Sequence, residues 1–128
     1  MVIIFSSSRA RKQLLTKGKV YTFRRGKLRK KLGSDWAAAR RGGHKIADII
    51  INPIIHVKPN HLEGALRPLV DYSGFDSVRD WLEEIYRINE RLPEGWIYRV
   101  DTINRRSYAV MRPIVVLSGD APGVVIEL

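Results

Sequence analysis

Short apolar runs, separated by glycine, proline and charged residues, predict several β-strands along this chain. We expect strands over residues 2–5, 19–24, 46–57 and 96–103. The third run is apolar on both faces around residues 49–51, which predicts a central strand that is buried on both sides. Asn52 and Pro53 interrupt this run and predict a bend or bulge, because proline cannot donate to a β-ladder.

Helical periodicity is clearest near residues 77–92, where Ser77 and Asp80 match a capping box. The predicted inner face of this amphipathic helix consists of Val78, Trp81, Leu82, Ile85, Tyr86 and Asn89. On the outer face we expect Glu83 to pair with Arg87, four residues later.

The remaining segments predict shorter elements. Residues 9–16 indicate a short helix that begins after a run of serines and ends near Gly18. Residues 25–43 are expected to form a long loop, in which Ser34 or Asp35 can cap one helical turn.

The order of these elements predicts an α+β fold with two or three helices and a small mixed β-barrel as its natural closure. The chain has 128 residues, which is enough for one domain with a hydrophobic core and too short for two ordinary domains. We expect a single domain over residues 1–128, in which residues 104–128 form a C-terminal extension with the pattern of a β-hairpin.

Charge is distributed unevenly along the chain. The formal net charge is +10, and residues 9–45 hold 14 of the 23 Lys and Arg residues but only one of the 13 acidic residues, Asp35. A basic block of this density favours a polyanion-binding surface over a merely solvated basic face.

Several function classes are disfavoured. The absence of cysteine excludes disulfides and thiolate metal sites, and His44, His56 and His61 do not have a metal-ligand spacing. Gly42 and Gly43 are a lone pair rather than a nucleotide-cradling loop, so we expect neither a metal nor a cofactor. No window is long enough to span a membrane, and the pattern is typical of a cytoplasmic protein. The single glutamine, Gln13, hints at a thermophilic source.

The basic stretch supplies the candidate nucleic-acid contacts. The predicted phosphate-binding residues are Lys19, Arg24, Arg25, Lys27, Arg29, Lys30, Lys31, Arg40, Arg41 and Lys45. Trp36 is the main stacking candidate, whereas Tyr21 is expected to pack in the core. A single strand, a loop or a flipped base of RNA suits this pattern best, and DNA remains the alternative because charge alone does not separate the two polymers.

Four segments carry a resemblance to a known family. They are residues 17–24 (KGKVYTFR), 41–48 (RGGHKIAD), 73–82 (SGFDSVRDWL) and 95–100 (GWIYRV). Together they resemble the ASCH domain family, whose members share the PUA-like β-barrel, and the match to a small, stand-alone, archaeal-type member runs from about residue 12 to about residue 103. In the family pattern of glycine, lysine and arginine, Lys19 and Arg24 match the two basic positions, whereas Lys17 stands at the glycine position.

The resemblance implies an RNA-facing cleft beside this motif. Some bacterial members are amidohydrolases of N4-acetylcytidine that use a lysine, a threonine three residues later and a glutamate before the long helix. Lys19 and Thr22 match the first two positions and are the catalytic candidates, but Ser73 stands where the glutamate is expected. A regular strand would place Lys19 and Thr22 on opposite faces, so this chemistry would require a bulge. The sequence therefore predicts an RNA-binding domain, with an amidohydrolase, a ribonuclease or a DNA-binding protein as alternatives.

Overall fold

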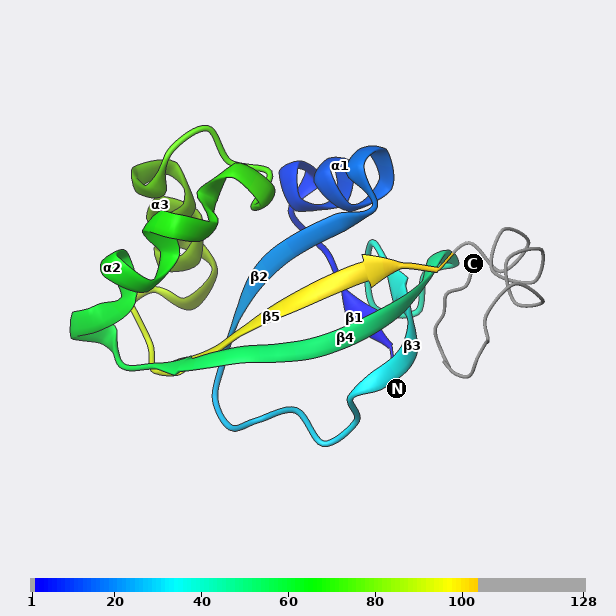
Figure 1. Cartoon of the computed structure of the whole chain (residues 1–128), viewed down its shortest axis with the longest axis horizontal. Helices are drawn as coiled ribbons and strands as arrows, with labels where there is room; N and C mark the ends of the chain where they lie inside the picture. Colours follow the sequence, from blue (N-terminus) through cyan, green and yellow to red (C-terminus); the bar gives the residue numbers. More distant parts are fainter. Residues whose placement is uncertain (1, 104–128) are drawn as a thin grey trace, which may run out of the picture.

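The structure, a computed structural model, describes residues 2–103 of the chain (Figure 1). The strands in this part are β1 (Ile3–Ile4), β2 (Lys19–Arg25), β3 (Gly33–Ala38), β4 (Lys45–Val57) and β5 (Gly95–Thr102). The α-helices are α1 (Ser8–Lys17), α2 (Leu62–Leu66) and α3 (Val78–Asn89), and α2 lies between two short 3₁₀-helices, η1 (Pro59–His61) and η2 (Arg67–Tyr72). The β-hairpin predicted for residues 104–128 lies outside the described residues.

The strands form one sheet in the order β1-β3-β4-β5-β2. β1 runs parallel to β3, and all other neighbours are antiparallel. The sheet curls into half a barrel whose edges are β1 and β2, while α2 and α3 lie together beyond the end of β4 (Figure 1). The predicted α+β class and the central position of β4 are therefore confirmed.

β4 carries the predicted irregularity. Its pairing with β5 shifts between Pro53 and Ile55, so the odd-numbered residues change from one face of the sheet to the other along the strand. Ile49 and Ile51 are fully buried, but Ile50 between them is 39% exposed. The prediction that this run is buried on both faces is wrong at Ile50, because the helical layer packs on another part of the sheet.

Two apolar clusters lie on the two faces of the sheet. One joins Val20 and Val100 to Leu14 of α1, and the other joins Phe23 to Trp81 and other residues of the helical layer. The alternation of β2 is the reason, because Val20 and Phe23 are three residues apart and point to opposite faces. Both faces of β2 are thus used in packing.

The helices begin at the predicted serine caps. Ser7 Oγ accepts the Ala10 N–H at the start of α1, and Ser77 Oγ accepts the Asp80 N–H at the start of α3. α1 ends at Gly18, whose φ of 77° is left-handed and suits glycine.

The outer face of α3 differs from its prediction. Glu83 pairs with Arg79 and Arg87 pairs with Glu84, so the expected pair between Glu83 and Arg87 is wrong. Tyr86, expected on the inner face, is 57% exposed. The wide apolar stripe in the sequence allowed several rotations of the helix, and contact with the sheet selected the one centred on Trp81 and Ile85.

The helical turn predicted after Ser34 or Asp35 is also wrong, because this segment is the strand β3. β3 pairs with β4 on one side and with β1 on the other, and Ala37 is completely buried. Pairing with the apolar β4 outweighs the helical propensity of the alanines, since propensity is a weak preference that tertiary contacts override. The expected long loop is therefore two shorter connections, over residues 26–32 and 39–44.

Replacing Gly95 by alanine is expected to destabilise the pairing of β2 with β5. A Cβ atom at this position would clash with the Arg24 carbonyl oxygen and lie 2.7 Å from the Arg25 Cα. We expect the free energy of unfolding, measured with urea, to fall by about 1 to 3 kcal/mol. Gly64→Ala is the control, because no atom lies within 4 Å of its Cβ position. A Gly95→Ala variant as stable as the wild-type protein would contradict this packing.

Candidate nucleic-acid interface

A cleft of about 450 Å³ lies along the edge strand β2. Its walls come from β2, the segment that follows β1, the β3–β4 turn and one face of α3. Three of the predicted phosphate-binding residues, Arg24, Arg25 and Arg41, line it together with Thr22. The fold thus brings arginines from two separate parts of the basic stretch to one concave site.

Arg24 is the most constrained of these arginines. Its Nη1 donates to the Ile4 carbonyl oxygen at 2.6 Å and its Nε donates to Thr22 Oγ1 at 3.1 Å. Its guanidinium carbon lies 4.8 Å from the centroid of the Phe5 ring. These contacts join the two edge strands of the half barrel, β1 and β2, which do not pair with each other.

The charge of Arg24 is poorly compensated. Within residues 2–103 it forms no ion pair with a carboxylate. Burial, followed by the positive charge of Arg29, lowers the pKa of Arg24 to about 10. Burying a charge without a counter-charge costs free energy. An anionic group in the cleft would offset this desolvation cost, because it would supply the counter-charge.

A second arginine fixes the segment after β1. Arg11 Nη1 donates to the carbonyl oxygens of Phe5, at 2.8 Å, and Ser6, at 2.9 Å. Together with Arg24, it satisfies three consecutive carbonyl groups of the turn from β1 into α1. Side-chain hydrogen bonds therefore hold this part of the cleft wall in addition to the pairing of β1 with β3 and the hydrogen bond from the Phe5 N–H to the Ala38 carbonyl oxygen.

The α3 wall mixes apolar and polar side chains at helical spacing. Trp81, Ile85 and Ile88 supply its apolar surface, and Glu84 and Asn89 supply its polar groups. These last three residues, Glu84, Ile88 and Asn89, were not predicted as site residues. The only signal in the sequence was their i+3, i+7 and i+8 spacing from Trp81. This periodicity places them near one face of the helix but does not show that this face borders a cleft.

Arg29 turns away from solvent, unlike its neighbours in the basic stretch. Its Nη2 lies 3.0 Å from Asp35 Oδ2, and the Asp35 side chain is only 1% exposed. Its backbone N–H donates to the Tyr98 hydroxyl at 2.8 Å, which anchors the 26–32 connection to β5. Arg29 thus has a role in the fold, whatever else it binds.

The pKa of the Asp35 carboxyl reflects this environment. Burial acts to raise it, but hydrogen bonds from the Trp36 N–H and from Arg29 outweigh burial and leave the pKa below its usual value. The only acidic residue in the basic block is therefore ionised and fully engaged.

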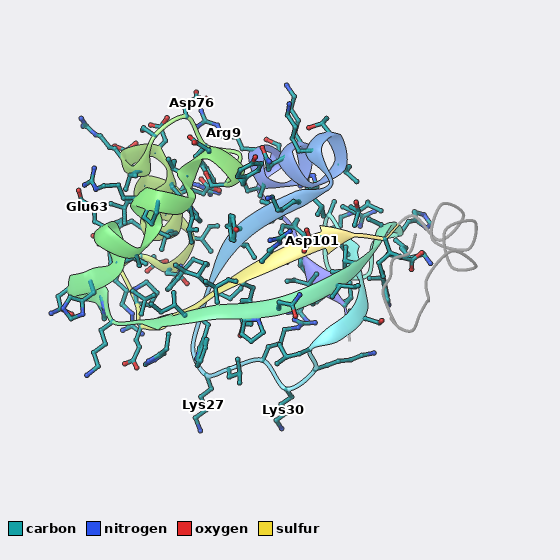
Figure 2. All side chains as sticks on the ribbon, viewed as in Figure 1. Arg9, Lys27, Lys30, Glu63, Asp76 and Asp101 are labelled. Carbon is teal, nitrogen blue, oxygen red and sulfur yellow. The ribbon has the colours of Figure 1, made fainter. Side chains whose placement is uncertain are left out.

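The other predicted phosphate-binding residues do not converge on the cleft. Lys27, Lys30, Lys31 and Arg40 are exposed, and Figure 2 shows Lys27 and Lys30 pointing away from the sheet. Lys45 is held by Asp48, with Nζ and Oδ1 3.1 Å apart. The stacking candidate, Trp36, is 36% exposed on the sheet and does not line the cleft.

The two catalytic candidates are not brought together. β2 pairs with β5 without a register shift over its whole length, so Lys19 and Thr22 point to opposite faces. Lys19 Nζ lies 3.9 Å from the centroid of the Tyr72 ring, whereas Thr22 faces the cleft. Ser73 is fully buried; its hydroxyl donates to the Val70 carbonyl and accepts the Phe75 N–H. Ser73 is thus a turn residue rather than a catalytic acid.

A neighbouring hollow has the opposite chemistry. It has a volume of about 480 Å³ and lies between the start of α1 and α3. Three acids, Asp80, Glu83 and Glu84, line it with two arginines, Arg9 and Arg87, and Glu84 borders the arginine-lined cleft as well. Arg9 is held near Asp80, with Nη1 and Oδ2 3.5 Å apart. This carboxylate-rich hollow is a poor phosphate site, so the charge distribution favours the arginine-lined cleft.

Comparisons with protein-family models, curated proteins and solved structures give no match for this chain. The resemblance to the ASCH family therefore rests on the sequence motifs and stays a prediction. Within residues 2–103, no three histidine or acidic side chains gather as a metal site. None of the helices in the same range is long and apolar enough to cross a membrane.

The ion pair between Arg29 and Asp35 is expected to stabilise the fold in a pH-dependent way. Breaking it with Asp35→Asn should lower the free energy of unfolding at neutral pH by about 3 kcal/mol, because it removes a buried carboxylate that pairs with the largely buried Arg29 guanidinium at 3.0 Å. The pKa of Asp35 is lowered in the folded state, so its contribution is present above about pH 4 and is lost as the pH falls through the folded value.

Urea titrations across this acidic range would measure both effects. The wild-type protein should lose stability on acidification more steeply than Asp35→Asn. Glu63→Gln is the control, because its pair with Arg67 is about two-thirds exposed and should contribute little. Parallel acid profiles for the wild-type protein and Asp35→Asn would rule out this role for Asp35.

Proposed function

We propose that this protein is an ASCH-type domain of the PUA-like class that binds nucleic acid, with RNA preferred to DNA, through the cleft beside β2. The observation that carries the proposal is the convergence of Arg24, Arg25 and Arg41 on one cleft, where Arg24 is desolvated and has no carboxylate partner among residues 2–103. Guanidinium groups suit phosphate oxygens because they donate in a planar fork.

The dimensions of the cleft support a local contact with an unstacked nucleotide. A volume of about 450 Å³ lies within the usual range of about 300 to 1,000 Å³ for small-molecule sites. Among the apolar side chains that line the cleft, Ile88 is 53% exposed and offers a surface on which a base can pack once it has left its stack, whereas Trp81 and Ile85 are buried in the core beneath it. This favours a single strand, a loop or a flipped base over a regular duplex.

The exposed cations outside the cleft support longer-range attraction. Lys27, Lys30 and Lys31 are exposed on the 26–32 connection, which follows directly from Arg25. With a net charge of +10, the chain attracts a polyanion before any specific contact forms. In this proposal, these lysines raise the association rate, whereas the cleft arginines contact the phosphate groups of the bound segment.

Replacing a cleft arginine should weaken binding and reduce its salt dependence. We expect Arg41→Gln and Arg25→Gln to lower the affinity for a labelled single-stranded RNA several-fold, and each to reduce the slope of log K against log salt by about 0.7, the value for one phosphate contact on a single strand. Arg67→Gln removes the same charge from an exposed residue that does not line the cleft, so it is the matched control.

Fluorescence anisotropy across a salt series would measure these affinities. Parallel measurements with DNA of the same sequence test the preference for RNA. Equal affinities for the two polymers would contradict this preference. Binding that does not change between low and moderate salt would contradict the proposal. If Arg67→Gln lowers the affinity as much as Arg41→Gln does, binding is due to diffuse attraction to the whole surface and not to the cleft.

A further inference from the structure

Glu84 of α3 stands between the cleft and the neighbouring hollow, and it lines both. Glu84 has a side chain that is only 21% exposed, and it lines the same cleft as the three arginines. Arg87 donates to it twice, from Nε to Oε1 at 3.0 Å and from Nη2 to Oε2 at 2.7 Å. These hydrogen bonds are the main cause that lowers the pKa of Glu84, so the group is ionised at neutral pH and acts only as an acceptor.

Asn89 presents a second acceptor on the same wall. Its Nδ2 donates to the Ile85 carbonyl oxygen at 2.9 Å, which orients the amide and uses one of its donor hydrogens. Its Oδ1 is then the group best placed to accept a hydrogen bond. Glu84 and Asn89 are five residues apart and line the cleft on either side of the apolar surface of Ile85 and Ile88.

The two walls of the cleft therefore have complementary chemistry. β2 and the β3–β4 turn supply cations, and α3 supplies hydrogen-bond acceptors around an apolar centre. A nucleotide has the same division, because its phosphate is an anion, its base has apolar faces, and some bases carry hydrogen-bond donors at the edge. A phosphate on the arginine wall would leave the edge of the base directed at Glu84 and Asn89.

We infer that the α3 wall makes the cleft selective for bases that carry an exocyclic amino group, such as cytosine and adenine, over uracil. This inference rests on the proposed function and specifies which nucleotide the same cleft takes. An amino group can donate to the Glu84 carboxylate, as glutamate accepts from the amino group of cytosine in other recognition sites. Uracil instead has carbonyl oxygens on both sides of its single ring N–H, and these would face the carboxylate unpaired.

Binding of short homopolymeric RNAs of equal length tests the inference, because cytosine, adenine and uracil oligonucleotides carry the same phosphates. At neutral pH and fixed salt, we expect the wild-type protein to bind the uracil oligonucleotide about tenfold more weakly than the other two, the size expected from one hydrogen bond to a charged group. In Glu84→Gln this difference should shrink to less than about threefold, because the amide of glutamine also donates to carbonyl oxygens.

Glu83→Gln provides the matched control. It makes the same chemical change one residue earlier on α3, at a side chain that is 64% exposed and does not line the cleft. It should keep the full preference of the wild-type protein. Asn89→Ala is a second test in the cleft and should lower the affinity for cytosine and adenine more than for uracil. Circular dichroism of each variant would establish that it is folded.

The outcomes separate this inference from the proposed function. Equal, salt-dependent binding of all three oligonucleotides would overturn the base preference and leave the phosphate site in place. A preference that persists in Glu84→Gln and Asn89→Ala would also overturn the assignment of these residues. Failure to bind any of the oligonucleotides would overturn both proposals.

Discussion

The contact of Arg24 with Ile4 is the constraint on which the rest of the molecule depends. A sheet that curls only halfway round leaves two edge strands facing each other without a ladder between them. Arg24 spans this opening with hydrogen bonds to both edges, and its guanidinium also packs against Phe5. Using Arg24 to close this opening costs free energy. Its charge is desolvated, and no carboxylate of residues 2–103 pairs with it.

This constraint links the fold to the candidate site. The residue that closes the half barrel also lines the cleft, so any anion that binds there is placed at the point where the two edges meet. The arginine wall and the α3 wall come from distant parts of the chain. The cleft therefore exists only when the strand edge, the β3–β4 turn and α3 are all assembled, and its charge pattern depends on the tertiary structure.

Local pattern was enough to predict much of this fold. Alternation located β2 and β5, a continuous apolar run located β4, serine caps located the starts of both longer helices, and Asn52 and Pro53 marked the bulge. β3 was missed because its alanines favour a helix in isolation, and only the neighbouring strands favour an extended conformation.

The candidate site was less predictable, because charge density along the sequence does not say which way each side chain points. Arg29 looked equivalent to Arg25, yet it turns inward to the single acid of the block. Lys19 and Thr22 matched a motif, but regular pairing directs them to opposite faces. Glu84 and Asn89 could not be recognised, since the facing of an amphipathic helix is set by its contacts with the sheet.

The bulge in β4 has a consequence for the molecule as a whole. Because the strand changes face at this point, its first half packs into the cluster with α1, and its second half packs into the cluster with α2 and α3. One continuous backbone is therefore shared by two cores that otherwise lie on opposite sides of the sheet. The two cores are therefore linked through the backbone of β4.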